Sequence, residues 1–457
     1  MKRPLLLIAI VALAHAAAYI GHMRPDWDVA WTDQGGYKML GEGLARTGTF
    51  TRYPDAPAFV PEVLRTPGYP VFVAAVYRVF GVGNDLAVVI AQAFVFAALC
   101  LLVYALARRV ADERLALGAA ALTALYPPLP HFGALVLTEL WTTFAATGAM
   151  LLVVRAAQDR RLRDFALAGV LLSATTLVRP VFILLPFFLA VAVPILVPAQ
   201  RDRRALAGWA ALALAAALTM VPWFAYNYVN LGRLTLSPAG GIGRGLWEGA
   251  WQGRWPGRVQ ATLTAMADTP VDTDALDAQV RAYASETGHD AALMLDYVHE
   301  WRDIRAIWDT PTDPFERARA RIVADDEYLR AALVHIRQDP LEHVVRRATR
   351  GTFVLWAAET PIRYTLVNEL PTVVIRAIWL VQVVLLLLAV AGIVWLTRMG
   401  RWLEAVLLTL PLVYVTVVHL PLLCEARQSL PVKPLVLILA TLGAHGLNRF
   451  RAGRERT

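Results

Sequence analysis

Ten runs of apolar residues occupy most of this chain, and each approaches the length that a membrane crossing needs. A helix crosses the hydrocarbon core with about 20 apolar residues, with some tolerance for shorter runs. The mean hydropathy of +0.49 and the 57% hydrophobic content agree with lipid as the solvent. We therefore predict an all-α polytopic membrane protein with about ten transmembrane helices, near residues 4–22, 84–107, 114–130, 136–154, 164–178, 180–197, 205–226, 372–397, 402–420 and 430–447.

Arginines at the ends of these runs predict the orientation. If Lys2 and Arg3 are cytoplasmic, the short loops that share their side carry most of the other arginines, as the positive-inside rule requires. These are Arg108, Arg109, Arg114, Arg155, Arg160, Arg161, Arg163, Arg201, Arg203, Arg204, Arg398 and Arg401. The net charge of +8 thus lies at membrane edges, and nucleic-acid binding is not expected. Both termini are predicted to be cytoplasmic, and the excess of arginine over lysine favours a bacterial inner membrane.

The first run, "MKRPLLLIAIVALAHAAAYIGHM", has two interpretations. Its "AHA" resembles the small-residue cleavage site of a signal peptide, but the apolar run continues beyond that point. We favour an uncleaved anchor. Cys100 and Cys424 both lie at or within predicted spans, so we expect packing residues and not a disulfide framework.

Two segments on the outer side are too long to be simple connectors. Residues 23–83 contain "RTPGYPVFVAAVYRVFG", a short apolar stretch suited to a helix along the membrane interface. Residues 227–371 are charged and rich in Trp, with helical periodicity interrupted at Pro340, which predicts a small helical extracytoplasmic insertion. The predicted division is a transmembrane catalytic module at 1–226, the insertion at 227–371, and C-terminal helices with a basic tail at 372–457.

Ionisable and polar residues gather at the predicted outer ends of the spans. Because such groups are costly at bilayer depth, they tend to face a cavity, and several from distant segments suggest one site. They are Asp33, Arg65, Glu139, Arg179, Asn227, Glu425 and Arg427.

A series of motifs extends over almost the whole chain in order. It comprises "TDQGGYKMLGEGLARTGTF", "LRTPGYPVFVAAVYRVFG", "TELW", "LVRP", "VPWFAYNYVNLGRLTLSPAGGIGRGLWEG" and "HLPLLCEARQSLPVKPLVL". The series resembles the membrane glycosyltransferases of the C superfamily, in the branch of protein O-mannosyltransferases and lipid A aminoarabinose transferases. The resemblance implies transfer of a hexosyl or pentosyl unit from a polyprenyl-phosphate donor to a hydroxyl of a lipid, glycan or protein, on the periplasmic or extracellular side.

In that family an acidic residue of the first outer loop is the catalytic base, and Asp33 has the matching position. A carboxylate there can take the proton of the attacking hydroxyl, and attack opposite the phosphate would invert the anomeric centre. The alternative for Asp33 is a turn residue beside Gly35 and Gly36. Asp26 and Asp28 compete for the role but lack the Gly/Tyr sequel.

Glu139 in "TEL" matches the family's second acidic position, which implies a role in placing the acceptor or binding a metal. Its alternative is an acid favoured at a helix N-terminus. No cofactor is certain from the sequence. A divalent ion held by Asp33 and Glu139 stays an open expectation.

The departing lipid phosphate needs cationic partners, and the resemblance implies Arg65, Arg179 and Arg427, with Tyr69 of "RTPGYP" as a further substrate contact. Gln428 replaces the tyrosine of the family's "RY-x-x-P" segment. The alternatives are surface anchoring for Arg65, a helix stop for Arg179, and for Arg427 an ion pair with Glu425 or snorkelling to the headgroups.

Other functional classes are less consistent with the chain. "GGIGRGLWEG" resembles a phosphate-binding loop but lacks the strand-to-helix context of a nucleotide site. A transporter or flippase of a lipid-linked sugar is the main alternative, although the chain shows no clear internal repeat or midplane charge. A noncatalytic scaffold is a third. The expected partners are the polyprenyl-phosphate sugar, an unidentified hydroxyl acceptor and membrane lipids.

Overall fold

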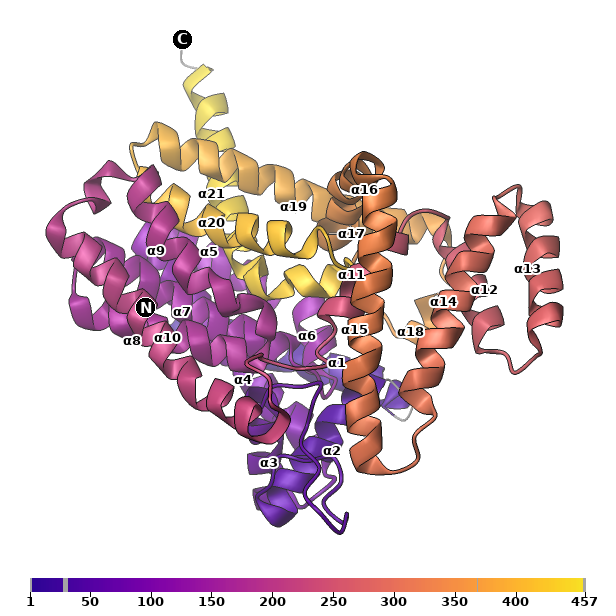
Figure 1. Ribbon diagram of the computed structural model, residues 1–457. Helices are drawn as coiled ribbons and strands as arrows, with labels where there is room; N and C mark the ends of the chain where they lie inside the picture. The colour runs from indigo at the N-terminus through magenta and orange to yellow at the C-terminus, as the bar shows by residue number, and fades with distance from the viewer. Residues whose placement is uncertain (1, 28–31, 368, 455–457) are drawn as a thin grey trace.

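The computed structural model describes residues 2–27, 32–367 and 369–454, and the regular elements in these ranges are all helical (Figure 1). Seven helices in the described ranges are long and apolar enough to cross a membrane. They are α1 (Lys2–Met23), α4 (Asp85–Val110), α7 (Glu139–Asp159), α10 (Arg203–Leu231), α19 (Thr372–Arg398), α20 (Trp402–His419) and α21 (Lys433–Arg454), the last extended by η5 (Ala426–Val432). The predicted all-α polytopic membrane fold is confirmed.

The other three predicted spans form shorter helices that pack among these seven. They are α5 (Glu113–Ala124), α8 (Leu162–Val178) and α9 (Leu185–Leu196). Prolines end or open these helices: Pro128 begins α6 (Pro128–Gly133), and Pro180 begins η2 (Pro180–Leu184) directly after α8. Pro198 begins η3 (Pro198–Gln200) after α9. α8 packs along α7 and α10, and α5 packs against α4 and α21.

The long connections of the chain are helical as well. Between α1 and α4 lie η1 (Arg24–Asp26), α2 (Thr32–Thr47) and α3 (Gly68–Phe80), and α2 packs against α3 at the lower end of the view in Figure 1. Between α10 and α19 lie α11 (Ile242–Trp251), α12 (Gly257–Asp268), α13 (Thr273–Thr287), α14 (Ala291–Asp309), α15 (Pro314–Gln338), α16 (Pro340–Arg346), the π-helical turn η4 (Arg347–Gly351), α17 (Thr352–Ala357) and α18 (Tyr364–Val367). The interruption predicted at Pro340 is confirmed.

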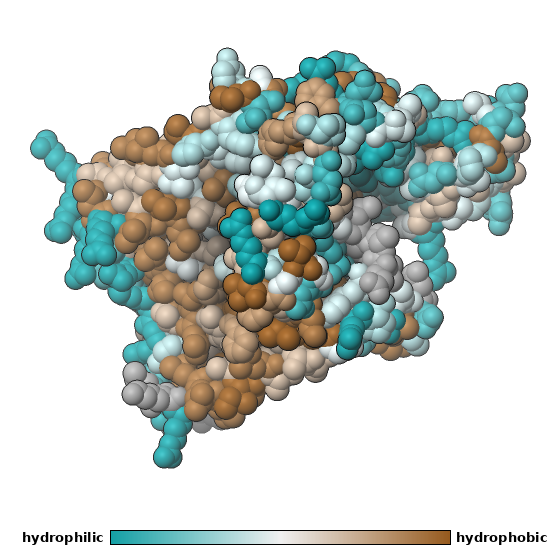
Figure 2. All heavy atoms as spheres, turned by 90° about the horizontal axis from the view of Figure 1, so that it is seen from below, coloured by the Kyte–Doolittle hydropathy of each residue, from teal (hydrophilic) through white to brown (hydrophobic). Residues whose placement is uncertain are grey.

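The helices between α10 and α19 have an aromatic core of their own. Trp247, Trp251, Tyr297 and Trp301 pack together there, apart from the core of the bundle. Figure 2 shows apolar side chains over much of the bundle surface and mainly polar ones over the projecting helices. The surface therefore matches a lipid-embedded bundle with a water-exposed insertion. The exact boundaries 1–226, 227–371 and 372–457 stay a prediction.

The loops predicted to be cytoplasmic meet at one end of the bundle. Their contacts are Arg109 with Asp159 at 3.0 Å, Arg155 with Asp164 at 2.9 Å, Arg160 with Asp202 at 2.5 Å, and Arg401 with the carbonyl of Val110 at 2.5 Å. Asp159 ends α7 and Asp164 lies in the first turn of α8. Glu139 at the start of α7 and Arg179 just after α8 therefore lie at the opposite end of these helices.

Close contact between α19 and α21 depends on two glycines. A side chain on Gly443 would collide with the backbone of Leu388 and Gly392, and one on Gly392 would collide with the backbone of Leu439. Backbone atoms in two packed helices cannot rotate away as a flexible side chain can. The small residues thus set the distance between these helices.

We expect Gly443→Ala to destabilise the protein by about 1–3 kcal/mol, as overpacking does in well-packed cores. The melting temperature in detergent should fall by several degrees. Gly21→Ala is the matched control, because the space around Gly21 is open. Equal melting temperatures for the two variants would contradict this account of the α19–α21 contact.

Candidate active site

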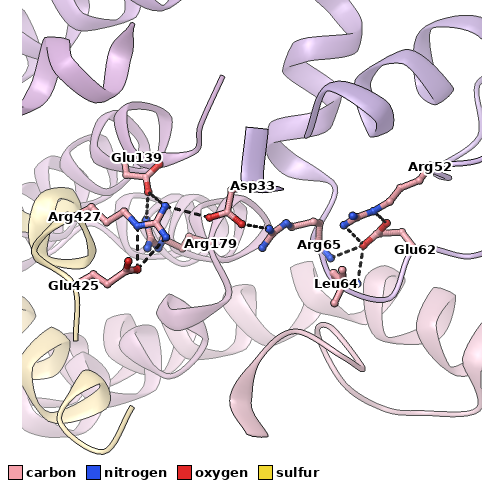
Figure 3. Close-up of polar contacts among 9 residues, drawn as sticks. All are labelled: Asp33, Arg52, Glu62, Leu64, Arg65, Glu139, Arg179, Glu425 and Arg427. Carbon is pink, nitrogen blue, oxygen red and sulfur yellow. Dashed lines mark hydrogen bonds and ion pairs between the residues drawn. The ribbon is translucent and has the colours of Figure 1, made fainter. Parts of the chain in front are cut away.

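Arg427 lies among carboxylates from three distant parts of the chain (Figure 3). Its guanidinium nitrogens are 3.2 Å from Asp33 Oδ2, 3.6 Å from Glu139 Oε1 and 2.9 Å from Glu425 Oε2. Asp33 belongs to the first turn of α2, Glu139 to the first turn of α7, and Arg427 to η5. One arginine therefore joins the connection between α1 and α4 to the segment before the last helix.

Two further arginines complete this ionic cluster. Arg65 donates to the other oxygen of Asp33, so that this carboxylate lies between two guanidinium groups (Figure 3). Arg179 Nη1 is 3.3 Å from Glu139 Oε1. We call Asp33, Arg65, Glu139, Arg179, Glu425 and Arg427 the charged cluster. Its three carboxylates balance its three guanidinium groups, which lowers the cost of placing so much charge together.

Glu62 fixes the loop that carries Arg65. Its carboxylate accepts hydrogen bonds from the backbone N–H of Leu64 at 2.7 Å and of Arg65 at 3.0 Å, and it is only 4% exposed. Arg52 donates two hydrogen bonds to the same carboxylate, at 2.5 and 2.9 Å (Figure 3). The Arg65 guanidinium lies over the Tyr37 ring, 5.0 Å from its centroid. Backbone and side chain of Arg65 are therefore both held in place.

Gln428, at the position where the resemblance implies a tyrosine, has a structural role here. Gln428 Oε1 accepts from the backbone N–H of Glu425 at 3.0 Å, and the Glu425 side chain caps η5 in return. This reciprocal pair holds Glu425 beside Arg427. The expected ion pair between Glu425 and Arg427 is thus present together with the contacts of Arg427 to Asp33 and Glu139.

The environment keeps Asp33 ionised. Burial alone would raise the pKa of its carboxyl, but the charges and hydrogen bonds of Arg65 and Arg427 outweigh burial and lower the pKa to about 2. The carboxylate is therefore present at any pH above about 4 while both arginines remain beside it. In this state Asp33 is a weak base.

Hydrogen-bonding capacity is left over in the cluster. Within the described part of the chain, Arg65 Nε and Glu139 Oε2 are buried and have no hydrogen-bond partner, and Arg179 Nη1 has only its ion pair with Glu139 Oε1 at 3.3 Å. Buried polar groups are normally satisfied, so such a concentration is typical of a site that receives a ligand.

The structure brings together most of the residues singled out from the sequence. Asp33, Arg65, Glu139, Arg179 and Arg427 all belong to the charged cluster. The amide of Asn227, by contrast, donates to the carbonyls of Thr235 and Leu236. The functional roles assigned to the cluster residues stay predictions.

Tyr69 lies behind the cluster and not in it. Its side chain is 1% exposed, its hydroxyl donates to Gln92 at 2.8 Å, and its ring packs against Tyr37 at 5.1 Å. This position favours a supporting role through Tyr37 over the predicted direct contact with substrate. The competing carboxylates Asp26 and Asp28 lie outside the residues whose side chains the structure describes.

The divalent ion stays a prediction, and the two carboxylates expected to hold it are paired with arginines in this structure. Asp33 and Glu139 share Arg427, and each carboxylate has a second arginine partner. Guanidinium groups on both carboxylates would repel a cation placed between them. Nor do the described residues contain a group of three or more His, Cys, Asp or Glu that could hold a metal.

Comparisons with known proteins agree with this architecture. A family model described as dolichyl-phosphate-mannose-protein mannosyltransferase matches residues 64–226. A comparison with curated protein sequences gave no match.

Among solved structures, the chain is similar to the oligosaccharyltransferase AglB from Archaeoglobus fulgidus in complex with an inhibitory peptide and a dolichol-phosphate. The TM-score is 0.50 at 16% identity, over 99% of this chain and 52% of that one. The form of the Archaeoglobus enzyme tethered with an acceptor peptide gives a TM-score of 0.50 at 15% identity, over 96% of this chain and 49% of that one. ArnT from Cupriavidus metallidurans gives a TM-score of 0.39 at 16% identity, over 98% of this chain and 79% of that one.

This chain spans about half the length of the archaeal enzyme. At these identities the structural similarity shows the fold, and the family model adds the sequence pattern. The resemblance predicted from the motifs is confirmed: residues 64–226 carry the pattern of the dolichyl-phosphate-mannose-protein mannosyltransferase family, in a chain whose fold is similar to that of the archaeal oligosaccharyltransferase.

Proposed function

We propose that this protein transfers a sugar from a polyprenyl-phosphate donor to an acceptor hydroxyl, with inversion at the anomeric carbon. The observation that carries the proposal is Asp33 held between Arg65 and Arg427, where the buried Arg65 Nε has no hydrogen-bond partner. A carboxylate next to such guanidinium groups combines a proton acceptor with cations for a phosphate.

The donor class is supported by the family model and the archaeal structure. The family's description names dolichyl-phosphate mannose, and the AglB structure contains a dolichol-phosphate. A lipid phosphate has anionic oxygens that can accept hydrogen bonds from the arginines, as the carboxylate oxygens of Asp33 and Glu139 do here. Bidentate arginine contacts suit that geometry.

In the proposed reaction the donor prepares the base. The phosphate takes hydrogen bonds from Arg65 and Arg427 and thereby frees the Asp33 carboxylate. The pKa of Asp33 then rises, because burial remains and the cationic partners have turned to the phosphate.

The acceptor oxygen forms a bond to the anomeric carbon as the bond from that carbon to the phosphate oxygen breaks. The electron pair leaves with the lipid phosphate, and the hydroxyl proton passes to Asp33. Arg65 and Arg427 stabilise the charge that develops on the phosphate.

Orientation is part of the proposal. The arginine-rich loops lie at the end of the bundle away from the charged cluster. With those loops in the cytoplasm, both termini are cytoplasmic and the reaction takes place on the periplasmic or extracellular side of a bacterial inner membrane.

Asp33→Asn is expected to reduce transfer by about 10²–10⁴-fold, the usual contribution of a general base. The protein is reconstituted in liposomes with undecaprenyl-phosphate sugars, and transferred sugar is measured by mass spectrometry. Asp55→Asn is the matched control, since Asp55 is an exposed carboxylate paired with Arg46. Transfer that is unaffected by Asp33→Asn would refute the base assignment. Movement of the lipid without transfer would favour a flippase.

The pH dependence of kcat/KM should reflect the arginine partners of Asp33. In the wild type, protonation of Asp33 should not lower kcat/KM above about pH 4, because its pKa in the free protein is about 2. Arg65→Gln removes one cation, so the pKa of Asp33 should rise. The fall of kcat/KM at acidic pH should then begin at a higher pH than in the wild type. If the acidic part of the kcat/KM profile is the same in Arg65→Gln and the wild type, protonation of Asp33 does not determine it.

Cysteine labelling of intact cells tests the orientation. The Asp55→Cys variant should react with a membrane-impermeant maleimide, whereas the Arg161→Cys variant should react only after permeabilisation. Both positions are exposed, and the native Cys100 and Cys424 are buried, so the wild type is the unlabelled control. The reverse pattern would place the charged cluster in the cytoplasm.

A further inference from the structure

A cavity of about 580 Å³ lies beside the charged cluster. Its wall is formed by the connection after α17, the first turns of α19, part of α6 and the start of η5. Glu425 and Arg427 belong to both the cavity wall and the charged cluster. Figure 3 shows the Arg427 side chain directed toward Asp33 and Glu139, with the Glu425 carboxylate beside it. The cavity has the volume usual for small-molecule sites, about 300–1,000 Å³.

The wall combines aromatic surface with hydrogen-bonding groups. Phe132 and Trp379 supply the rings, and Glu359 and Thr360 supply oxygen atoms beside them. Trp379 is held from two sides: its indole N–H is 3.4 Å from Thr360 Oγ1, and its ring packs edge-on against Phe353 at 5.5 Å. A fixed aromatic face next to hydrogen-bond acceptors suits a ligand with an apolar ring face and hydroxyls at its edge.

Charge in the wall is balanced and does not favour an anion. Glu359 and Glu425 offset Arg376 and Arg427, and Arg427 already contacts three carboxylates. Burial raises the pKa of Glu359 to about 7, although Lys433 and Arg427 oppose the shift. A carboxyl group with that pKa can donate or accept a hydrogen bond near neutral pH, which suits an uncharged hydroxyl partner.

We propose that this cavity binds a sugar ring, with Trp379 against the ring face and Glu359 hydrogen-bonded to ring hydroxyls. The proposal rests on the proposed function, because it places a glycosyl unit next to Arg427 and so next to Asp33. The ring can belong to the donor or to a glycan acceptor, and both present the same hydroxyl chemistry.

Binding measurements in nanodiscs distinguish the two sources. The probes are bare undecaprenyl phosphate and undecaprenyl phosphate that carries mannose, glucose, galactose or arabinose. If the donor sugar occupies the cavity, at least one glycosylated lipid binds the wild type more tightly than the bare lipid does. Glu359→Gln should then reduce that gain in affinity at least tenfold, and Trp379→Leu should reduce it about fivefold. Both variants should bind the bare lipid with a Kd within about twofold of the wild-type value. Glu369→Gln is the control, since Glu369 is an exposed carboxylate outside the cavity wall.

If the ring belongs to a glycan acceptor, Glu359→Gln should instead raise the KM for the acceptor in the liposome assay and leave donor affinity unchanged. An equal loss of affinity for bare and glycosylated lipid would overturn the proposal, as would variants that change neither donor affinity nor acceptor KM. The two proposals fail separately. Transfer that survives Asp33→Asn refutes the base, whereas the sugar-dependent gain in affinity tests the cavity without turnover.

Discussion

The contacts of Arg427 with Asp33 and Glu139 hold together the end of the molecule that carries the charged cluster. They connect residues that are almost 400 positions apart in the chain, and without them three carboxylates would face one another in a half-buried space. Removing one member of such a group is costly, because the charges of the remaining members no longer balance in a partly buried space. The positions of α2, α7 and η5 relative to one another therefore depend on this balance of charge.

Under the proposed function, that same balance suits a site that receives an anionic substrate. A cluster with three arginines and three carboxylates is stable without a ligand, yet each arginine can exchange a carboxylate for a phosphate. The exchange requires no large movement of the backbone, because Glu62 and Arg52 fix the loop of Arg65 independently of Asp33. Glu62 and Arg52 thus hold the backbone of Arg65, whereas its guanidinium neutralises a different residue, Asp33.

Much of this site could be predicted from the sequence, for a physical reason. Ionisable residues at the ends of apolar runs are costly, so Asp33, Glu139 and Arg427 stood out once the spans had been identified. Glu62 and Glu359 carried no comparable signal, because each lies in an irregular segment with no period or motif. Their roles depend on which backbone N–H groups or cavity walls the fold places beside them. The lengths of α5 and α9 were overestimated for a related reason: hydropathy shows where a run is apolar, but prolines decide where its helix begins or ends.

The insertion is joined rigidly to the segment that carries Arg427. Arg347, 2% exposed, donates to the carbonyls of Leu420 and Leu422 and to the side chain of Gln252, which itself accepts from the backbone N–H of Cys424. The backbone N–H of Leu423 donates to the carbonyl of Gly245 in α11 at 2.6 Å. A tilt of α11 must therefore drag residues 420–424 with it and shift the guanidinium next to Asp33. The place of Arg427 beside Asp33 is thus set partly by helices that lie outside the charged cluster.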